Sequence, residues 1–380
     1  MNGPAKPKRV LQVLEATLGG TRRYLENVFD ALGAGSHNGL VYSLHRSDAE
    51  FVRLLGRLRE AGWALFEVDM RRPIDLRRDL SCVLAMRAIY RAFRPDVVHA
   101  HASKAGAIAR LATFGMRGRP GIVYSPHAIG VHLGWIYRPI EHVLARRLDV
   151  LSAVTCSERD ELCALKLLPS GRIHVVVPAI RSDVYAPADR IAARRQLSLS
   201  DGPLVVAIGR LTQQKDPLAF VDFVAELRKR VGTVRGMWVG DGELRQEVEE
   251  RIAALDLRGK VSIAGWKDDV RPYIAACDLL VSTSLYESFG YVTAEAMAMD
   301  RPVVASAITG TVDVVTTDIG DQLYRSRDIA SAAELAERLL CDASRASAIA
   351  ERGRMHVLST FSTAAMRRGL DGAYSAAVQR

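Results

Sequence analysis

Short apolar runs alternate with longer amphipathic stretches along the whole chain. Seven runs in the first half have the length and the β-branched content typical of strands, and helical stretches separate most of them. They are Val10–Leu14, Leu40–Leu44, Ala64–Val68, Val97–Ala100, Ile122–Ser125, Val150–Cys156 and His174–Val177. Apolar strands that alternate with helices predict a parallel sheet covered on both faces.

The same pattern restarts after Pro187, with a second series of strands. Two series of similar length in 380 residues predict two doubly wound α/β domains, residues 1–180 and 181–362, with a linker near 178–200. Residues 363–380 form a predicted helix that we expect to pack back on the first domain. The second series consists of Leu204–Ile208, Arg235–Val239, Val261–Ala264, Leu279–Ser282, Pro302–Ser306 and Gln322–Tyr324.

Candidate chemistry follows the predicted strands, where open parallel sheets bind their ligands. Two glutamates, Glu287 and Glu295, stand eight positions apart after the strand Leu279–Ser282, and a helical run begins near Val292. Free amides at a helix start suit a diphosphate, and carboxylates accept paired hydrogen bonds from vicinal hydroxyls. A helix cap with a solvent-facing glutamate is the alternative for this segment taken alone.

These residues resemble a known enzyme family. Glu287 and Glu295 match the E-x7-E element of glycosyltransferase family 4, and the resemblance extends to Val205–Asp216, Val239–Leu244 and Ile263–Trp266. It is continuous over the second domain and looser over the first. It implies the GT-B architecture, with two Rossmann-like doubly wound parallel-sheet domains facing across a cleft. It also implies retaining transfer of a sugar from a nucleotide-diphosphate sugar bound by the second domain to an acceptor bound by the first.

The resemblance implies roles for individual residues. Arg210 and Lys215 neutralise the leaving diphosphate, which stabilises charge that develops in the transition state. Glu287 holds sugar hydroxyls, Glu295 holds ribose, and His127 lies near the reacting sugar. The residues expected to be catalytic are Glu287, Arg210, Lys215 and His127. Those expected to bind donor or nucleotide are Glu295, Gly290, Phe289, Tyr291, Gly19, Gly20, Gly265, Trp266, Asp241 and Gly242.

Several of these positions have a plain structural alternative. Gly19 and Gly20 can be a helix-start turn, Asp241-Gly242 a turn between a strand and a helix, and Trp266 a residue that packs against a wall of the cleft. The run His99–Gly106 resembles the H-x-H-x-S-K-A-G stretch of bacterial polysaccharide glycosyltransferases. Its members His101 and Lys104 either line the acceptor side or cap the next helix.

The first domain departs from the family pattern at one loop. Pro178-Ala179 replaces the Asn-Gly pair that many members carry there, which puts donor or acceptor details in doubt. We expect no metal and no cofactor, since no Asp-x-Asp motif ends a strand and Asp268-Asp269 look like a helix start. Arg210, Lys215 and the helix terminus supply the positive charge instead.

Charge is distributed unevenly along the chain. Residues 1–180 hold 26 Lys and Arg against 16 Asp and Glu, whereas residues 181–380 hold 26 against 27. A basic first half suggests contact with an anionic membrane surface or with nucleic acid, and the absence of nucleic-acid-binding motifs favours the membrane. A poor secretory signal and five scattered cysteines predict a cytoplasmic protein with reduced thiols.

Two segments suit peripheral contact at the inner face of the cytoplasmic membrane, where a lipid-linked or other saccharide acceptor would be met. One is the apolar stripe from Trp135 to Leu148. The other is an arginine cluster over residues 71–94, beside Leu76, Leu80, Leu84 and Tyr90. The alternative is two core helices with solvated basic faces.

Two rival functions remain open on the sequence. A sugar-nucleotide epimerase of the same architecture would convert the donor without an acceptor. A catalytically silent sugar-nucleotide-binding subunit of a polysaccharide assembly complex would release no nucleotide diphosphate. The sequence does not choose between UDP and GDP or among sugars, although lipid-linked intermediates of cell-surface polysaccharides fit the resemblance.

Overall fold

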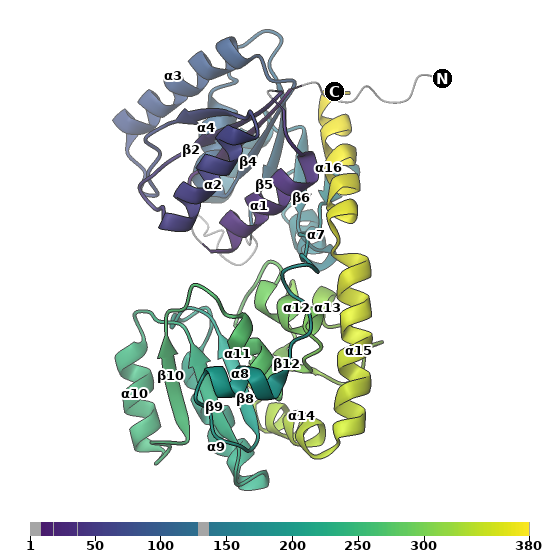
Figure 1. Ribbon diagram of the computed structural model, residues 1–380. Helices are drawn as coiled ribbons and strands as arrows, with labels where there is room; N and C mark the ends of the chain where they lie inside the picture. The colour runs from purple at the N-terminus through teal and green to yellow at the C-terminus, as the bar shows by residue number, and fades with distance from the viewer. Residues whose placement is uncertain (1–8, 18, 36, 128–136, 380) are drawn as a thin grey trace. The chain divides into compact units, whose positions relative to one another are not determined.

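The computed structural model describes residues 9–17, 19–35, 37–127 and 137–379. The chain divides into two compact units. The first contains residues 1–179 and 363–380, and the second contains residues 180–362. Each unit is a parallel sheet between layers of helices (Figure 1), which confirms the predicted α/β fold class.

The sheet of the first unit has seven strands in the order β3-β2-β1-β4-β5-β6-β7, and every recorded pairing is parallel. The order reverses between β1 and β4, which is the switch point of a doubly wound sheet. The strands are β1 (Val10–Leu14), β2 (Asn38–Tyr42), β3 (Ala64–Glu67), β4 (Val97–His101), β5 (Gly121–Ser125), β6 (Val150–Ala153) and β7 (Ile173–Val175).

Helices cover both faces of this sheet. The first-unit helices are α1 (Gly20–Leu32), α2 (Ala49–Glu60), α3 (Leu76–Phe93), α4 (Ser103–Leu111), α6 (Tyr137–Ala145), α7 (Cys156–Ala164), the short 3₁₀ helix η1 (Ser170–Arg172) and α16 (Thr363–Val378). Strand side chains alternate between the faces. Leu11 and Val13 of β1 join the apolar cluster beneath α3 and α4, whereas Leu14 joins the cluster beneath α1 and α2.

Helix α16 returns from the end of the chain to the first unit, where it packs beside α1 and against β5 (Figure 1). Its approach is close, because a Cβ on Gly121 of β5 would lie 2.4 Å from the carbonyl oxygen of Ala377. A glycine is therefore needed at the start of β5. The last helix is an integral part of the first unit's core.

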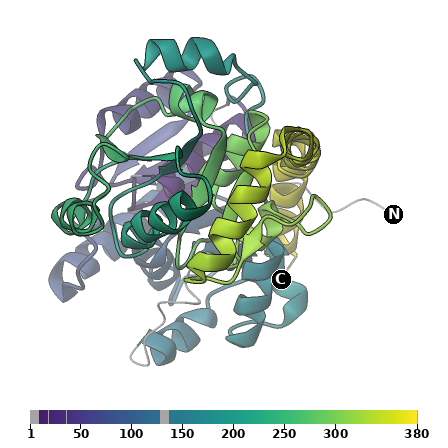
Figure 2. The ribbon, with the colours of Figure 1, turned by 90° about the horizontal axis from the view of Figure 1, so that it is seen from below.

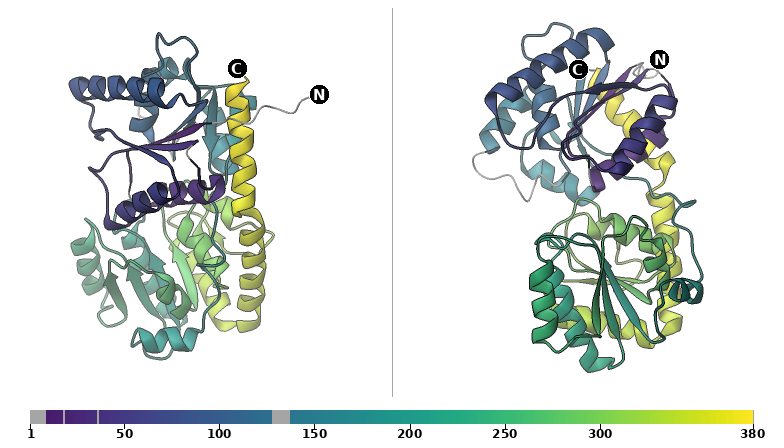
Figure 3. Two further views of the ribbon diagram at one scale, coloured as in Figure 1. Left: turned by 45° about the horizontal axis from the view of Figure 1, so that its top comes forward. Right: turned by 60° about the vertical axis from the view of Figure 1, so that its left-hand side comes forward.

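The second unit has six strands in the order β10-β9-β8-β11-β12-β13, which is the Rossmann order 3-2-1-4-5-6 within this unit. They are β8 (Leu204–Ile208), β9 (Arg235–Val239), β10 (Val261–Gly265), β11 (Leu279–Ser282), β12 (Val303–Ser306) and β13 (Leu323–Tyr324). Helices lie on both faces of the sheet (Figure 3), and α14 packs beside both α9 and α15 (Figure 2). These helices are α8 (Arg190–Gln196), α9 (Pro217–Arg230), α10 (Arg245–Ala254), α11 (Arg271–Ala276), α12 (Tyr291–Ala298), α13 (Thr311–Val314), α14 (Ile329–Cys341) and α15 (Ala343–Thr360).

One local prediction needs correction. The strand expected at Val150–Cys156 ends at Ala153, because the Thr155 hydroxyl accepts a hydrogen bond from the Glu158 amide (3.2 Å) and so caps α7. The two units divide between Ala179 and Ile180, inside the stretch expected to be the linker, and α8 in that stretch packs against α11 of the second unit. Within the described residues, no helix is both long enough and apolar enough to span a bilayer.

Candidate functional site

A small pocket lies at the carboxyl ends of β8 and β11, the adjacent strands at which the order of the second sheet reverses. Ligands of doubly wound sheets bind at this place because the loops that follow the two strands diverge there. The pocket is lined by Ala207, Ile208, Lys215, Trp238, Leu280, Val281, Ser282, Thr283, Ser284, Glu287, Gly290, Val292 and Thr293.

An ion pair between Lys215 and Glu287 is the central feature of this pocket. The Lys215 ammonium contacts Glu287 Oε1, which also accepts a hydrogen bond from the Ser284 hydroxyl at 3.0 Å. The side chain of Lys215 is 23% exposed and that of Glu287 is 12% exposed. Both charges are therefore held in place but remain within reach of a ligand in the pocket.

Hydrogen bonds between the two loops fix this pair, whose members are 72 residues apart in the sequence. The Thr283 hydroxyl lies 2.9 Å from the Lys215 carbonyl and 3.0 Å from that of Asp216. The Leu285 amide donates to the Gln214 carbonyl at 2.8 Å, and the Gln214 side-chain amide donates to the Tyr286 carbonyl at 3.1 Å. The backbone of both loops is thus bonded, so the charged side chains start from rigid positions.

The third loop, after β9, supports the loop that carries Arg210. Gly240 has a φ of 143°, and a Cβ there would lie 1.9 Å from the Gly209 carbonyl oxygen. A Cβ on Gly242 would lie 2.5 Å from the Leu211 carbonyl oxygen. The Trp238 indole donates to the same Gly209 carbonyl at 2.8 Å. These glycines therefore have a packing reason, as the alternative interpretation of this turn allowed.

Arg210 and Asp241 have different surroundings at the tips of these loops. Arg210 is exposed, and among the residues that the structure describes no side chain pairs with its guanidinium. Asp241 accepts a hydrogen bond from Arg245 at 2.8 Å and one from the Gly242 amide at 2.8 Å. Arg210 is thus available to an anion, whereas Asp241 already has a partner.

The segment around the second glutamate is mostly buried. Gly290, with a φ of 86°, precedes α12 and lines the pocket, and Tyr291 is the first residue of that helix. The Phe289 ring is only 2% exposed and packs against Phe361, so a ligand can meet only its backbone. Glu295 is 1% exposed and does not line the pocket. Its contact with ribose stays a prediction.

Gly265 and Trp266 follow the neighbouring strand β10. The Gly265 carbonyl accepts a hydrogen bond from the Gly240 amide at 2.9 Å, which ties the ends of β9 and β10 together. The Trp266 side chain is 62% exposed, and its indole donates to Asp268 at 3.2 Å. Trp266 is therefore not buried against its own unit, and a contact with the nucleotide base stays a prediction.

In the first unit, Gly19 and Gly20 lie just after β1. Gly19 has a φ of 66° and caps α1, which begins at Gly20. The Thr21 hydroxyl donates to the Ala16 carbonyl at 2.6 Å and so closes the turn. The helix-start interpretation therefore describes the local structure, and the two glycines leave the helix terminus without a side chain in front of it.

His127 lies just after β5, with its ring stacked on His101 and edge-on to Tyr24. Its backbone has a φ of 52°, and its Nε2 lies 3.3 Å from Nδ1 of His101. Burial lowers the pKa of His127 to about 4 and that of His99 to about 3, and it lowers the pKa of His101 well below its usual value. All three imidazoles are neutral near pH 7, so His127 can act there as a hydrogen-bonding group but not as a fixed positive charge.

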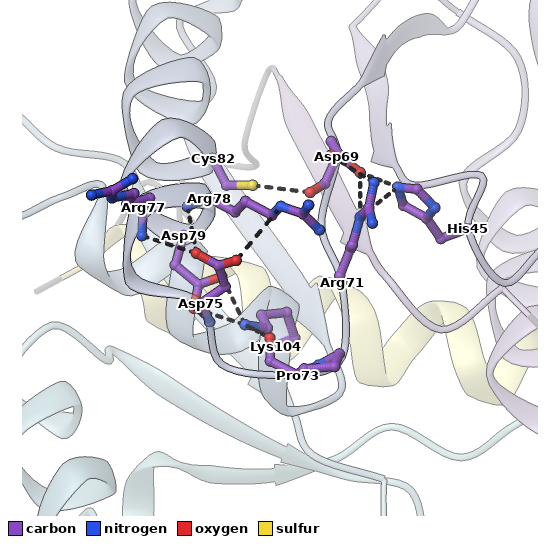
Figure 4. Close-up of polar contacts among 10 residues, drawn as sticks. All are labelled: His45, Asp69, Arg71, Pro73, Asp75, Arg77, Arg78, Asp79, Cys82 and Lys104. Carbon is purple, nitrogen blue, oxygen red and sulfur yellow. Dashed lines mark hydrogen bonds and ion pairs between the residues drawn. The ribbon is translucent and has the colours of Figure 1, made fainter.

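Lys104 has a structural role in this unit. Its ammonium pairs with both carboxylate oxygens of Asp79, at 2.7 and 2.8 Å, and donates to the Pro73 carbonyl at 2.9 Å (Figure 4). Only 9% of its side chain is exposed. Lys104 thus holds the start of α3 against α4, and its place on the acceptor side stays a prediction.

Four residues that shape the second-unit pocket were not among those predicted from the sequence. Ser284 and Thr283 bond to Glu287 and to the Lys215 loop, and Trp238 bonds to the Arg210 loop. Gly310 allows the turn at Ser288 to pack closely, since a Cβ on it would lie 2.6 Å from the Ser288 carbonyl. The polar pair Thr283-Ser284 follows a predicted strand, so the sequence could have indicated it as part of the site. The residues next to Gly310 in the sequence do not indicate its role.

Among the described residues, no group of three or more His, Cys, Asp or Glu side chains is placed to hold a metal ion.

Comparisons with known proteins agree with this geometry. Residues 19–179 match the family described as "Glycosyl transferase 4-like domain", and residues 202–342 match "Glycosyl transferases group 1". The alpha-D-kanosaminyltransferase of Streptomyces kanamyceticus is 29% identical over 298 residues, which cover 73% of this chain and 76% of the relative. The Escherichia coli UDP-Gal:alpha-D-GlcNAc-diphosphoundecaprenol alpha-1,3-galactosyltransferase is 25% identical over 282 residues, with coverage of 70% and 72%.

A solved structure supports the fold over nearly the whole chain. The crystal structure of Anabaena Alr3699/HepE in complex with UDP and glucose has a TM-score of 0.80 and 19% identity, and covers 96% of this chain and 98% of its own. Both domain families, the two parallel-sheet units and the pocket at the switch point therefore agree with the expected resemblance. The chain belongs to the glycosyltransferases of the group 1, GT4-like family and has the GT-B fold.

Proposed function

We propose that this protein is a retaining, metal-independent glycosyltransferase. It transfers a sugar from a nucleotide-diphosphate sugar to a lipid-linked saccharide in cell-surface polysaccharide biosynthesis. Two similar proteins support this substrate class, since one is named for a UDP-linked donor and a diphosphoundecaprenol-linked acceptor, and one structure contains UDP and glucose.

The observation that carries the proposal is the Lys215–Glu287 pair in the pocket at the switch point. In a nucleotide-diphosphate sugar the pyrophosphate is directly attached to a hydroxylated sugar ring. A site for it therefore needs a cation for the phosphates next to a carboxylate for the sugar hydroxyls. Lys215 and the exposed Arg210 bind the phosphates, and the amides at the start of α12 add their partial positive charge. Glu287, already oriented by Ser284, accepts hydrogen bonds from the sugar hydroxyls.

The chemistry is a substitution at the anomeric carbon. A bond forms between the acceptor hydroxyl oxygen and this carbon, while the bond from the carbon to the phosphate oxygen breaks. Negative charge develops on the leaving diphosphate, where Lys215 and Arg210 stabilise it. The acceptor proton passes to the leaving phosphate on the same face of the sugar, which retains the configuration. No step in this scheme requires a metal.

The first unit is proposed to bind the acceptor. Gly19 and Gly20 present the open end of α1, and His127 offers a neutral imidazole to a sugar hydroxyl. This division assigns the donor to residues 180–362 and the acceptor to residues 1–179 with α16. The first unit, which has the higher positive charge, would then bind the lipid-linked acceptor.

We also propose that the protein works in the cytoplasm and docks peripherally on the inner membrane face through α3. Leu76, Leu80 and Leu84 repeat every fourth residue and are 83%, 60% and 55% exposed, and Ile74 just before them is 63% exposed. Seven arginines and three aspartates lie in residues 69–94, so the stripe is bordered by positive charge. Tyr90, expected on this surface, is instead 3% exposed in the core.

The second expected membrane segment is less suited to docking. Trp135 and Ile136 lie outside the described residues. In α6, Ile140 and Val143 are 45% and 49% exposed, whereas Leu144 is buried. Of the parts of these two segments that the structure describes, α3 combines an exposed apolar stripe with flanking arginines. Such a surface suits an anionic bilayer, which takes up the leucines and attracts the arginines.

The proposed reaction predicts that nucleotide diphosphate is released only when donor and acceptor are both present. A panel of UDP- and GDP-sugars is first screened by thermal shift. The stabilising donor is then incubated with membrane lipid extract, and nucleotide diphosphate and radiolabelled lipid product are measured, with and without EDTA. We expect equal turnover with and without EDTA. A donor converted to an epimer without lipid, or bound without any nucleotide release, would instead support one of the two rival functions.

The membrane proposal predicts that the Leu76→Ser/Leu80→Ser/Leu84→Ser variant loses vesicle binding. Sedimentation with phosphatidylcholine vesicles containing phosphatidylglycerol should show about tenfold or more weaker binding, because each inserted leucine contributes on the order of 1 kcal/mol. The control is Val52→Ser, which removes an exposed apolar side chain (56%) from α2. Equal binding by all three proteins, or a change of oligomeric state in the triple variant alone, would contradict membrane docking through α3.

A further inference from the structure

A buried group of polar side chains connects His127 to the last helix of the chain. Gln12, His99, His101 and Ser125 are each at most 1% exposed and lie on β1, β4 and β5. Strand alternation and register place them together, because Gln12 pairs with His99 and His101 pairs with Ser125. Tyr374 of α16, 1% exposed, reaches the same group. So many buried polar groups are stable only if their hydrogen bonds are all made.

The hydrogen bonds of Tyr374 fix the tautomer of His99. The Gln12 side-chain amide nitrogen donates to the Tyr374 hydroxyl oxygen at 3.0 Å. Among the described residues the one other recorded partner of this buried phenol is His99 Nδ1, also at 3.0 Å, so its single proton is satisfied only by donation to that nitrogen. The proton of neutral His99 is therefore on Nε2, which donates to the Ser125 hydroxyl at 2.8 Å.

The other end of the Gln12 side chain determines the tautomers of the two remaining histidines. Its carbonyl oxygen can only accept, so His101 donates to it from Nε2 at 2.9 Å. His101 Nδ1 is then an acceptor, and the ring nitrogen that faces it, His127 Nε2, is the donor at 3.3 Å. The three imidazoles therefore all carry their proton on Nε2.

This series of hydrogen bonds ends at the Val176 carbonyl, a group that can only accept. Ser152 and Ser125 are both hydrogen-bond partners of the Tyr24 hydroxyl, and Tyr24 donates its single proton to the Val176 carbonyl at 3.3 Å. From His127 to Val176 every donor thus points the same way. Hydrogen bonds arranged in one direction polarise and strengthen one another in a low-dielectric core.

We infer that Tyr374 and Gln12 are positioning residues that hold His127 as the Nε2–H tautomer, so that His127 Nδ1 is a hydrogen-bond acceptor for a saccharide hydroxyl. Among the described residues, none bonds to this Nδ1. A lone acceptor on a neutral ring recognises a hydroxyl and disfavours an anion. The identity of the bound group rests on the proposed function, whereas the tautomer does not. Helix α16 thereby becomes a functional part of the first unit.

Long-range ¹H–¹⁵N NMR of the full chain with ¹⁵N-labelled histidine tests this inference. We expect an unprotonated Nδ1 for His127, whose signals are assigned by their loss in His127→Gln. Tyr374→Phe should produce a mixture of tautomers, since nothing then fixes the orientation of the Gln12 amide, and Gln12→Met should do the same. Tyr90→Phe is the matched control, because its buried hydroxyl bonds to the Ala109 carbonyl and is outside this network.

Turnover adds a readout that a purely structural role would not give. Tyr374→Phe should lower kcat by about 3- to 10-fold with an unchanged KM for the donor, as expected for one weakened hydrogen bond in the transition state. A protonated His127 Nδ1 in the wild type, or an unchanged tautomer in both Tyr374→Phe and Gln12→Met, would overturn the inference. A wild type without transferase activity would refute the proposed function alone, since the NMR result needs no turnover.

Discussion

Replacing Lys215 with Met is expected to lower kcat/KM for transfer by about 10²- to 10³-fold, the usual effect of removing one group that stabilises transition-state charge. Glu287→Gln should cause a loss of similar size, because the amide is a weaker acceptor for sugar hydroxyls. The two side chains contact each other, and Ser284 donates to the Glu287 oxygen that Lys215 contacts. We therefore expect the loss in the double variant to be smaller than the product of the single losses, measured with purified donor and acceptor.

A matched control for this prediction lies in the same unit. Lys229 pairs with Glu226 at 2.6 Å on the surface of α9, and its side chain is 72% exposed. Lys229→Met removes the same charge without touching the pocket, so kcat/KM should stay within about twofold of the wild type. The assignment of Lys215 and Glu287 fails if either single variant turns over at the wild-type rate while its thermal unfolding is normal.

Glu141→Gln is expected to cause the largest loss of stability, about 3–5 kcal/mol in the free energy of unfolding of the first unit. The Arg110 side chain is fully buried and makes two bonds to Glu141, at 2.7 and 3.1 Å. Its guanidinium also lies over the Tyr124 ring, 4.4 Å from the ring centroid. The substitution leaves a full positive charge in the core without its counter-charge. Chemical denaturation followed by tryptophan fluorescence measures the change.

Two further variants separate the buried charge from the loss of a side-chain contact. Arg110→Met/Glu141→Leu removes both charges and should recover most of the stability, because no charge then remains to be buried. Glu334→Gln breaks an exposed pair with Arg338 and should change the free energy of unfolding by less than about 1 kcal/mol. If Glu141→Gln has as small an effect as Glu334→Gln, the buried pair does not stabilise the first unit.

The amino-acid pattern alone determined the architecture of this protein. Strands such as Leu204–Ile208 and Leu279–Ser282 were located to the residue, because apolar runs bounded by turn signals depend on local sequence. The same pattern placed Lys215 and Glu287 after two strands of one predicted sheet, and the strand order of the structure makes these two strands neighbours. Parallel strands end at one edge, so their proximity follows from topology.

Other features were decided only by the tertiary structure. The sequence left Lys104 either on the acceptor side or at the cap of the next helix, and its ion pair with Asp79 of a different helix is visible only in the tertiary structure. Tyr90 was expected in a surface stripe and is in the core, whereas Leu76, expected in the same stripe, is exposed. Local periodicity gives each helix a preferred face, but which neighbour covers that face is set by packing between distant segments.

The group around His127 shows this division most clearly. Strand alternation predicts that His99 and His101 share a face of the sheet, and the sequence determined that much. Both are buried and neutral, and His99 is bonded to Tyr374, which lies on a helix 275 residues further along the chain. The pKa of an imidazole reflects the groups packed around it, and no local pattern encodes a neighbour so far away.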